Sequence, residues 1–226
     1  MSNFKATDDA IKYLRLGNAK LLAGELTGAI QDYSNSIGIV PQGFSAHYNR
    51  GIAKASLNKN QSALEDFKIA AEINPDHINS YLKCAIIKIK LSHYSDAIYD
   101  FTKLISLRPK DSSLYFNRGQ CKSMLNEHQN AIQDFNKAIE INSMDADSFN
   151  KRGESKKALN NSLGALDDFT KSIEIEPRHA IAHRNRGNIR FELYRLNHGC
   201  ADWRVASMLG DHESDKLLGM YCQSNI

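Results

Sequence analysis

Histidines and cysteines are the residues of this sequence most able to do chemistry, because imidazole and thiolate groups bind transition metals. His179 and His183 stand four residues apart, a spacing that on a helix places two imidazoles on one face as metal ligands. His179, however, follows Pro177 in a predicted turn. The residues 34, 68 and 102 positions before His183 are aromatic, which indicates a packing position. We therefore predict no metal here.

A second group of possible ligands lies near the C-terminus and comprises His198, Cys200, His212 and Cys222. Their spacings match no familiar zinc pattern, so no metal site and no cofactor are predicted. Cys200 and Cys222 can still meet, because a predicted C-terminal helix folds back over the helix that carries Cys200. They form a disulfide if the chain meets an oxidising compartment, and otherwise they pack as thiols.

Common enzyme motifs are missing from the sequence. It contains no glycine-rich phosphate loop, no HExxH metal motif and no nucleophile elbow. Catalysis requires converging groups of suitable type, and few are present. The sequence therefore predicts a protein that is not an enzyme. The alternative is a hydrolase or metal-dependent enzyme built on the C-terminal histidines, and metal bound to the purified protein would revive it.

Composition describes a chain that can bury a large core, with 42% apolar and 24% charged residues. A formal charge of +3 lacks the strong bias of a nucleic-acid binder, so nucleic acid is not the predicted partner. The polar start, residues 1–9, is expected to be flexible, and the most apolar stretch, Cys84–Ile89, is interrupted by Lys88. We expect a cytoplasmic protein without a membrane span, whose four cysteines are thiols by default because no CxxC pair is present.

The elements that position these residues follow a period of 34 residues. Small residues recur at this spacing without a change of register: Gly17, Gly51, Ala85, Gly119, Gly153 and Gly187. A second small column has the same spacing: Ala29, Ala63, Ala97, Ala131, Ala165 and Gly199. Four residues after each of these stands a ring: Tyr33, Phe67, Phe101, Phe135, Phe169 and Trp203. Such a period is typical of an array of stacked units.

The unit at 44–77 shows how each repeat is predicted to fold. Both of its halves have helical spacing, with a polar turn between them, and Pro75 ends the second helix because proline cannot continue one. Gly51 and Ala63 let the two helix backbones approach, and the ring that follows fills the space beside them. One such hairpin cannot bury both of its faces, so neighbouring hairpins must stack.

The order of small, aromatic and proline positions at these spacings resembles the tetratricopeptide repeat. The resemblance implies an all-α fold, an α-solenoid in which stacked hairpins form a right-handed superhelix. Six repeats are expected, at 10–43, 44–77, 78–111, 112–145, 146–179 and 180–210. The fourth has Ser143 where a proline stands in four of the others. The family often has an aromatic residue three positions after the first small residue, whereas this chain has cations: Lys20, Lys54, Lys88, Lys122, Lys156 and Arg190.

The cation column has an acidic counterpart just before each ring: Asp32, Asp66, Asp100, Asp134, Asp168 and Asp202. Opposite charges repeated in step predict an ion pair in each hairpin that joins the first helix to the second. The alternative is two columns of solvated charges. Because an exposed pair contributes only ~0.2–1 kcal/mol, we expect the pairs to set register rather than to add stability. They also reduce the positive field available to nucleic-acid phosphates.

The two ends of the array are predicted to differ from its middle. Gly210 and Asp211 end one helix and begin another, so residues 211–226 are expected to form a capping helix, from about 212 to 222, and a tail. The first repeat has no such cover. Its apolar residues Ile11, Leu14 and Leu21 are expected to pack on the start of the chain, on a partner or on a second copy, which makes a homo-oligomer possible.

The resemblance also places the first helix of each repeat on the concave side. An extended segment of another protein is the predicted partner, since amides can bind its backbone and cations its carboxylates. Leu14 and Glu154 occupy groove positions too. The predicted groove residues are Arg15, Asn18, Tyr48, Asn49, Ile52, Leu82, Lys83, Ile86, Phe116, Asn117, Gln120, Asn150, Lys151, Arg184, Asn185 and Asn188. The alternative is a wet surface with scattered apolar residues.

A narrower function is a co-chaperone with a carboxylate clamp, the set of lysines and asparagines with which relatives of this kind hold an acidic C-terminus. Asn18, Asn49 and Lys83 stand at matching positions, whereas Leu14 and Asn79 replace two expected lysines. Three matches of five leave the clamp an alternative to the main prediction of a non-enzymatic scaffold or adaptor.

Overall fold

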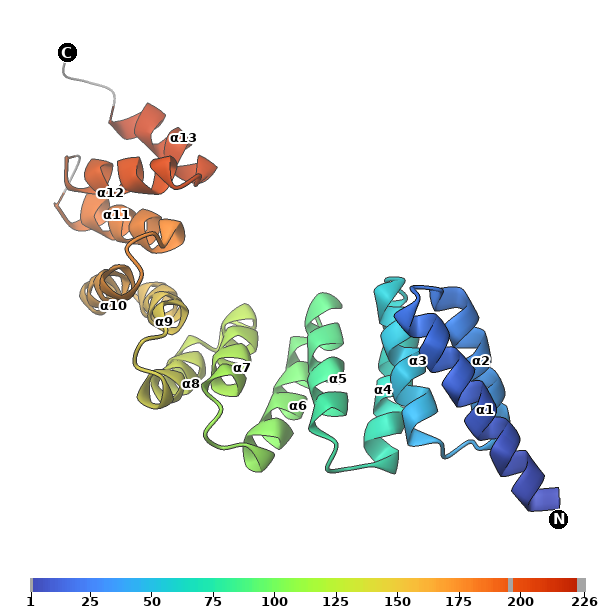
Figure 1. The fold of residues 1–226 in the computed structure, drawn as a ribbon. Coiled ribbons are helices and arrows are strands. Elements are labelled where there is room, and N and C mark those ends of the chain that lie inside the picture. Colours follow the sequence, from blue (N-terminus) through green and yellow to red (C-terminus); the bar gives the residue numbers. More distant parts are fainter. Residues whose placement is uncertain (1, 195–196, 223–226) are drawn as a thin grey trace. The chain divides into compact units, whose positions relative to one another are not determined.

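The computed structural model describes residues 2–194 and 197–222, which are helical throughout apart from turns and contain no strand. Figure 1 shows the helices in sequence, each lying beside the next within its part of the chain. In the described ranges they are α1 (Ser2–Leu22), α2 (Leu26–Ile39), α3 (Phe44–Ser56), α4 (Asn60–Ile73), α5 (Ile78–Lys90), α6 (Tyr94–Leu107), α7 (Ser112–Met124), α8 (His128–Ile141), α9 (Ala146–Ala158), α10 (Ser162–Ile175), α11 (Ala180–Tyr194), α12 (Asn197–Met208) and α13 (His212–Tyr221).

The helices group into two compact units, Met1–Pro109 and Lys110–Ile226. Each unit contains three helical hairpins, and the second also contains α13. The 34-residue period continues across the boundary without a slip, which is why the sequence predicts one uninterrupted array rather than two units. Within the parts of the chain that the structure describes, no helix is long and apolar enough to cross a bilayer.

A residue with positive φ ends the first helix of each of the first five hairpins. These residues are again 34 apart: Gly24, Asn58, Ser92, Asn126 and Asn160, with φ between 57° and 79°. Glycine and asparagine adopt this left-handed conformation at the lowest cost, so the chain can reverse within two or three residues. In these five hairpins, the polar turns are therefore the points at which the chain reverses.

In the hairpins whose first small residue is glycine, that residue lies directly against an aromatic ring of the second helix. A Cβ added to Gly51 would lie 2.8 Å from Phe67 Cε1, and one added to Gly153 would lie 2.7 Å from the equivalent atom of Phe169. Phe67 and Phe169 are fully buried. The third hairpin has Ala85 in place of glycine, and Ala85 and Phe101 are both buried there.

The first helix begins earlier than expected. α1 starts at Ser2, so residues 2–9 are helical, where the sequence analysis expects a flexible start. No proline or glycine interrupts this segment, and its polar composition alone suggested flexibility. The helix is held against α2, where the Ser36 hydroxyl donates a hydrogen bond of 2.9 Å to the carbonyl of Ala10.

Candidate functional site

The predicted ion pair is present in all six hairpins. The distance from the cation nitrogen to the nearer aspartate oxygen is 2.7 Å for Lys20–Asp32, 2.8 Å for Lys54–Asp66, 2.7 Å for Lys88–Asp100, 2.7 Å for Lys122–Asp134, 2.8 Å for Lys156–Asp168 and 2.9 Å for Arg190–Asp202. All six aspartates are buried. The cations lie on first helices and the carboxylates on second helices, so each pair fixes one helix against the other.

An arginine just before the small residue adds a second cation in four hairpins. Arg50 holds Asp66 through Nε and Nη2, at 3.0 and 2.7 Å, and Arg118, Arg152 and Arg186 hold the aspartates sixteen residues after them in the same way. The remaining terminal nitrogen of Arg50, Nη1, donates a hydrogen bond of 3.0 Å to the Ser34 hydroxyl of the preceding hairpin. The sequence analysis missed this column, although its regular spacing is visible in the sequence.

Asp66 and Asp100 have different numbers of cations, and their pKa values shift in opposite directions. Burial alone would raise the pKa of Asp66, but the hydrogen bonds and charges of Arg50 and Lys54 outweigh burial and hold that pKa below its ordinary value. In the third hairpin Cys84 replaces the arginine. Burial therefore raises the pKa of Asp100 above its ordinary value, because Lys88 opposes it without an arginine on the same carboxylate.

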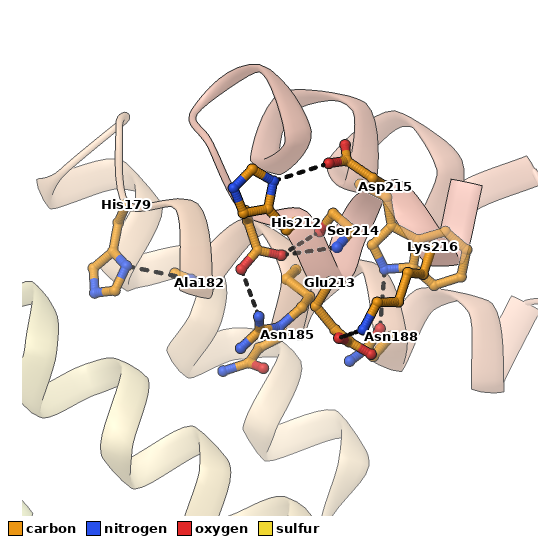
Figure 2. Close-up of polar contacts among 12 residues, drawn as sticks. His179, Ala182, Asn185, Asn188, His212, Glu213, Ser214, Asp215 and Lys216 are labelled. Atoms are coloured by element: carbon orange, nitrogen blue, oxygen red, sulfur yellow. Dashed lines mark hydrogen bonds and ion pairs between the residues drawn. The ribbon is translucent and has the colours of Figure 1, made fainter. Parts of the chain in front are cut away.

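The histidines weighed as metal ligands hold the chain together instead. The Nε2 atom of His183 lies 3.0 Å from the carbonyl of Pro177, and His47 repeats this contact to Pro41 at 2.9 Å. His179 Nδ1 accepts a hydrogen bond from the backbone N–H of Ala182, as Figure 2 shows, and its Nε2 lies 3.1 Å from Asp147. Among described residues, no cluster of three His, Cys, Asp or Glu side chains could hold a metal ion. The His198 side chain lies outside the described side chains.

Some first helices of neighbouring hairpins contact one another within a unit. α1 contacts α3 in the first unit, and α9 contacts both α7 and α11 in the second. The second helices make no comparable contacts with one another in the described ranges. The groove positions of the sequence analysis lie on these first helices.

In the first unit the structure joins two of the predicted groove amides. Asn49 Nδ2 donates to Asn18 Oδ1 at 2.8 Å, and the same oxygen accepts from the Tyr33 hydroxyl at 2.9 Å. Burial raises the pKa of Tyr33 to about 12, so its hydroxyl keeps its proton and remains a donor. Asn18 is thus fixed as an acceptor, and one N–H of Asn49 is used in holding the two helices together.

Two other predicted groove residues of this unit pack into its core. Tyr48 contacts Phe67 edge-on, with 5.7 Å between ring centroids, and lies 5.0 Å from the His77 ring. Ile52 packs against the same buried cluster. The remaining positions are more open: Leu82 and Lys83 are half-buried, and Arg15 and Ile86 are exposed. Lys83 makes no ion pair with any described residue.

In the second unit the groove positions form a connected polar network. Asn150 is buried and donates to Glu154 Oε1 at 3.0 Å, while Asn185 Nδ2 lies 3.0 Å from Asn150 Oδ1 and 3.1 Å from Glu154 Oε1. Lys151 pairs with the other oxygen of Glu154 at 2.8 Å. Phe116, Asn117 and Gln120 are half-buried on α7, where Asn117 donates to the Ser113 carbonyl at 2.7 Å.

The groove positions nearest the C-terminus have structural partners. Arg184 is paired with Asp211, the N-cap residue of α13, and Asn188 accepts a hydrogen bond of 2.9 Å from the Trp203 indole N–H. Figure 2 shows the polar side of this cap, where Lys216 bonds to Glu213 and His212 to Asp215. Arg184, expected as a groove cation, therefore anchors the cap, because its guanidinium reaches the start of α13.

The cap is fixed at its other end by a disulfide between Cys200 and Cys222. The default expectation of four free thiols is wrong for this pair, because α13 turns back and brings the two Cα atoms to 5.9 Å. Cys84 and Cys121 are buried free thiols. Tyr221 packs on Phe191 and Trp203, with ring centroids 4.8 and 6.1 Å away.

Comparison with known proteins identifies one repeat of the chain. The family model described as the tetratricopeptide repeat matches residues 112–145, the fourth predicted repeat. Residues 112–145 are therefore a tetratricopeptide repeat. The two helical units, built of hairpins with a shared 34-residue period, extend the matched repeat along the chain. No curated protein matches the sequence.

Solved structures of tetratricopeptide repeat proteins share the fold of this chain. YrrB, described as a repeat protein with an unusual peptide-binding site, aligns with a TM-score of 0.71 at 22% identity, covering 80% of this chain and 96% of its own. A MamA structure aligns with a TM-score of 0.67 at 21% identity, covering 73% and 96%. MamA from Desulfovibrio magneticus RS-1 gives 0.67 at 20% identity, covering 76% and 97%. At these identities the likeness shows the fold alone.

Proposed function

We propose that this protein is a non-enzymatic scaffold that binds an extended segment of another protein along the inner faces of its first helices. One observation carries the proposal. The groove positions vary from repeat to repeat in residue type, while the ion pairs and ring contacts behind them recur. Repeated positions hold the fold, so the varied ones are free to select a partner.

The chemistry of the first unit suits a peptide. Asn49 donates one amide N–H to Asn18 and has a second N–H and an oxygen that can bond to a peptide. Lys83 offers a cation with no acidic partner among the described residues. A peptide backbone needs donors and acceptors of this kind, and a carboxylate needs the cation. YrrB, a protein of the same fold, is described as having a peptide-binding site, which supports the proposal by analogy.

The carboxylate clamp remains a second candidate with weaker support. Asn18, Asn49 and Lys83 all lie in the first unit, but the oxygen of Asn18 is occupied by two donors. Leu14 and Asn79 supply no charge. A blocked peptide that ends in two acidic residues and a free carboxylate distinguishes the two functions, since a clamp requires that carboxylate and groove binding does not.

Partner retention by matched variants tests the proposal. The protein is immobilised and its partners from the native cell are quantified for the wild type, for Asn49→Ala with Lys83→Ala, and for Lys59→Ala with Lys103→Ala as a control. Tyr48 is left intact because it packs in the core. We expect the first variant to lose the partner and the control to keep it. Equal retention by both variants would refute groove binding in the first unit.

A further inference from the structure

The first unit contains an apolar hollow of about 210 Å³. It lies where α1, the end of α2 and the start of α3 meet. Its walls include Ala10, Ile11, Leu14, Val40, Gly43 and Phe44. Ser36 also borders it, but the Ser36 hydroxyl already donates to the Ala10 carbonyl. The hollow is therefore suited to an apolar group rather than to a polar one.

The next repeat shows what fits in such a space. Residues 34 positions after Ala10, Leu14 and Gly43 are Phe44, Tyr48 and His77. Their rings fill the equivalent site, with centroids 4.6 Å apart for Phe44–His77, 5.0 Å for Tyr48–His77 and 5.9 Å for Phe44–Tyr48. The first repeat has a methyl, an isobutyl group and no side chain in their places. The hollow thus lies where the next repeat has three rings.

The charges beside the hollow indicate what flanks its occupant. Ile11 forms part of the hollow and of an adjoining depression that also contains Asp8, Lys12 and Arg15. All three charged side chains are exposed, and neither cation makes an ion pair with any described residue. Two cations against one acid leave this depression positive, so it complements an acidic segment.

We infer that the hollow binds one aromatic side chain of a partner peptide, and that acidic residues on either side of this side chain pair with Lys12 and Arg15. The inference rests on the proposed function, because it names the partner chemistry for the first repeat of the same inner surface. The filled site of the next repeat supplies the aromatic preference, and the exposed cations supply the charge preference.

Titration of the whole 226-residue chain with defined peptides, followed by NMR, tests the inference. The probe is a blocked pentapeptide with phenylalanine between two acidic pairs, compared with its alanine-centred and lysine-flanked analogues. We expect shifts at residues 10–14 and 43–46, binding at least tenfold weaker for the alanine analogue, and weaker binding for the lysine analogue. Shifts confined to other residues, or equal binding of the phenylalanine and alanine peptides, would overturn the inference.

A self-filling variant provides the sharpest control. Leu14→Tyr with Gly43→His restores two of the rings found in the next repeat, so the fold has a natural precedent and the hollow should close. Leu14→Tyr alone is the milder version, to be used if a side chain at position 43 crowds the carbonyl of Val40. We expect at least a tenfold loss of peptide binding. Unchanged binding by a folded, filled variant would overturn the inference.

Two further comparisons separate the outcomes. The double variant Lys12→Gln with Arg15→Gln should bind the acidic peptide more weakly. The control Lys59→Gln with Lys103→Gln should bind it as the wild type does. Resonances of the hollow that shift with protein concentration alone would indicate a second copy as the occupant and would overturn the inference. If the filled variant keeps its cellular partner while the Asn49 and Lys83 variant loses it, the inference about the hollow is refuted and the proposal of groove binding is supported.

Discussion

Two aspartates at the same repeat position are predicted to respond oppositely to pH. Asp66 and Asp100 are both buried, but Asp66 binds Arg50 and Lys54, whereas Asp100 binds Lys88 and faces no arginine. Removing one partner of a buried ion pair costs about 3–5 kcal/mol. The cations of Asp66 keep some contact with solvent, so we expect Asp66→Asn to destabilise the protein by about 3 kcal/mol at pH 7, at the lower end of that range.

The pKa shifts fix the sign of the pH dependence. The pKa of Asp66 is lowered by folding, so its contribution to the free energy of unfolding is present above about pH 4 and is lost as pH falls through the folded pKa. The pKa of Asp100 is raised by folding, so its ionised form costs stability at pH 7, and this cost disappears as pH falls below its folded pKa. Asparagine does not titrate. The cost of Asp66→Asn should therefore shrink on acidification, and the cost of Asp100→Asn should grow.

Urea unfolding followed by circular dichroism between pH 3 and 7 measures both free energies, and amide exchange in α3–α6 assigns them to the correct hairpins. Parallel pH trends for the two variants would refute the reasoning that cation number sets the sign. An effect of Asp66→Asn below about 0.5 kcal/mol at pH 7 would refute the claim that the buried pair holds the two helices together.

Three further predictions follow from packing and sulfur chemistry. Reducing the Cys200–Cys222 disulfide, which closes a loop of 22 residues, should destabilise α13 by about 3 kcal/mol and speed its amide exchange, while α1–α6 exchange as before; unchanged exchange in α13 would contradict this. Gly153→Ala should cost about 1–3 kcal/mol in thermal or urea unfolding, because its methyl would meet the Phe169 ring, and a neutral result would show that α9 and α10 separate freely. Cys84 and Cys121, whose pKa values burial raises to about 12 and about 11, should not react with a thiol reagent in the native protein and should react fully once it is unfolded; fast native labelling would count against their burial.

Much of the fold could be predicted from the sequence because the repeat displays it six times. The small and aromatic columns indicate where helices meet, and the matched lysine and aspartate columns predict the ion pairs that the structure contains. The arginine column was equally visible. It was missed because Arg50 and its equivalents stand beside the groove positions, and sequence position alone does not show which way a side chain points around a helix.

Other features could not be predicted because they depend on absence or on context. The hollow becomes visible only when Ala10, Leu14 and Gly43 are set beside the three rings that fill the next repeat. The ion pair of Arg184 with Asp211 depends on the position of the start of α13 relative to α11. The division into two units leaves no mark on the period. The approach of Cys200 and Cys222 could be predicted, but their oxidation state depends on the redox surroundings, which the spacing does not determine.

A protection footprint of the bound partner tests the central claim most directly. The complex retained from the native cell is compared with the free protein by hydrogen–deuterium exchange, which reports every helix separately. We predict protection concentrated on the first helices, α1, α3 and α5 in the first unit and α7, α9 and α11 in the second, with little change in the second helices. Protection centred on α2, α4, α6, α8 and α10 would contradict binding along the inner faces.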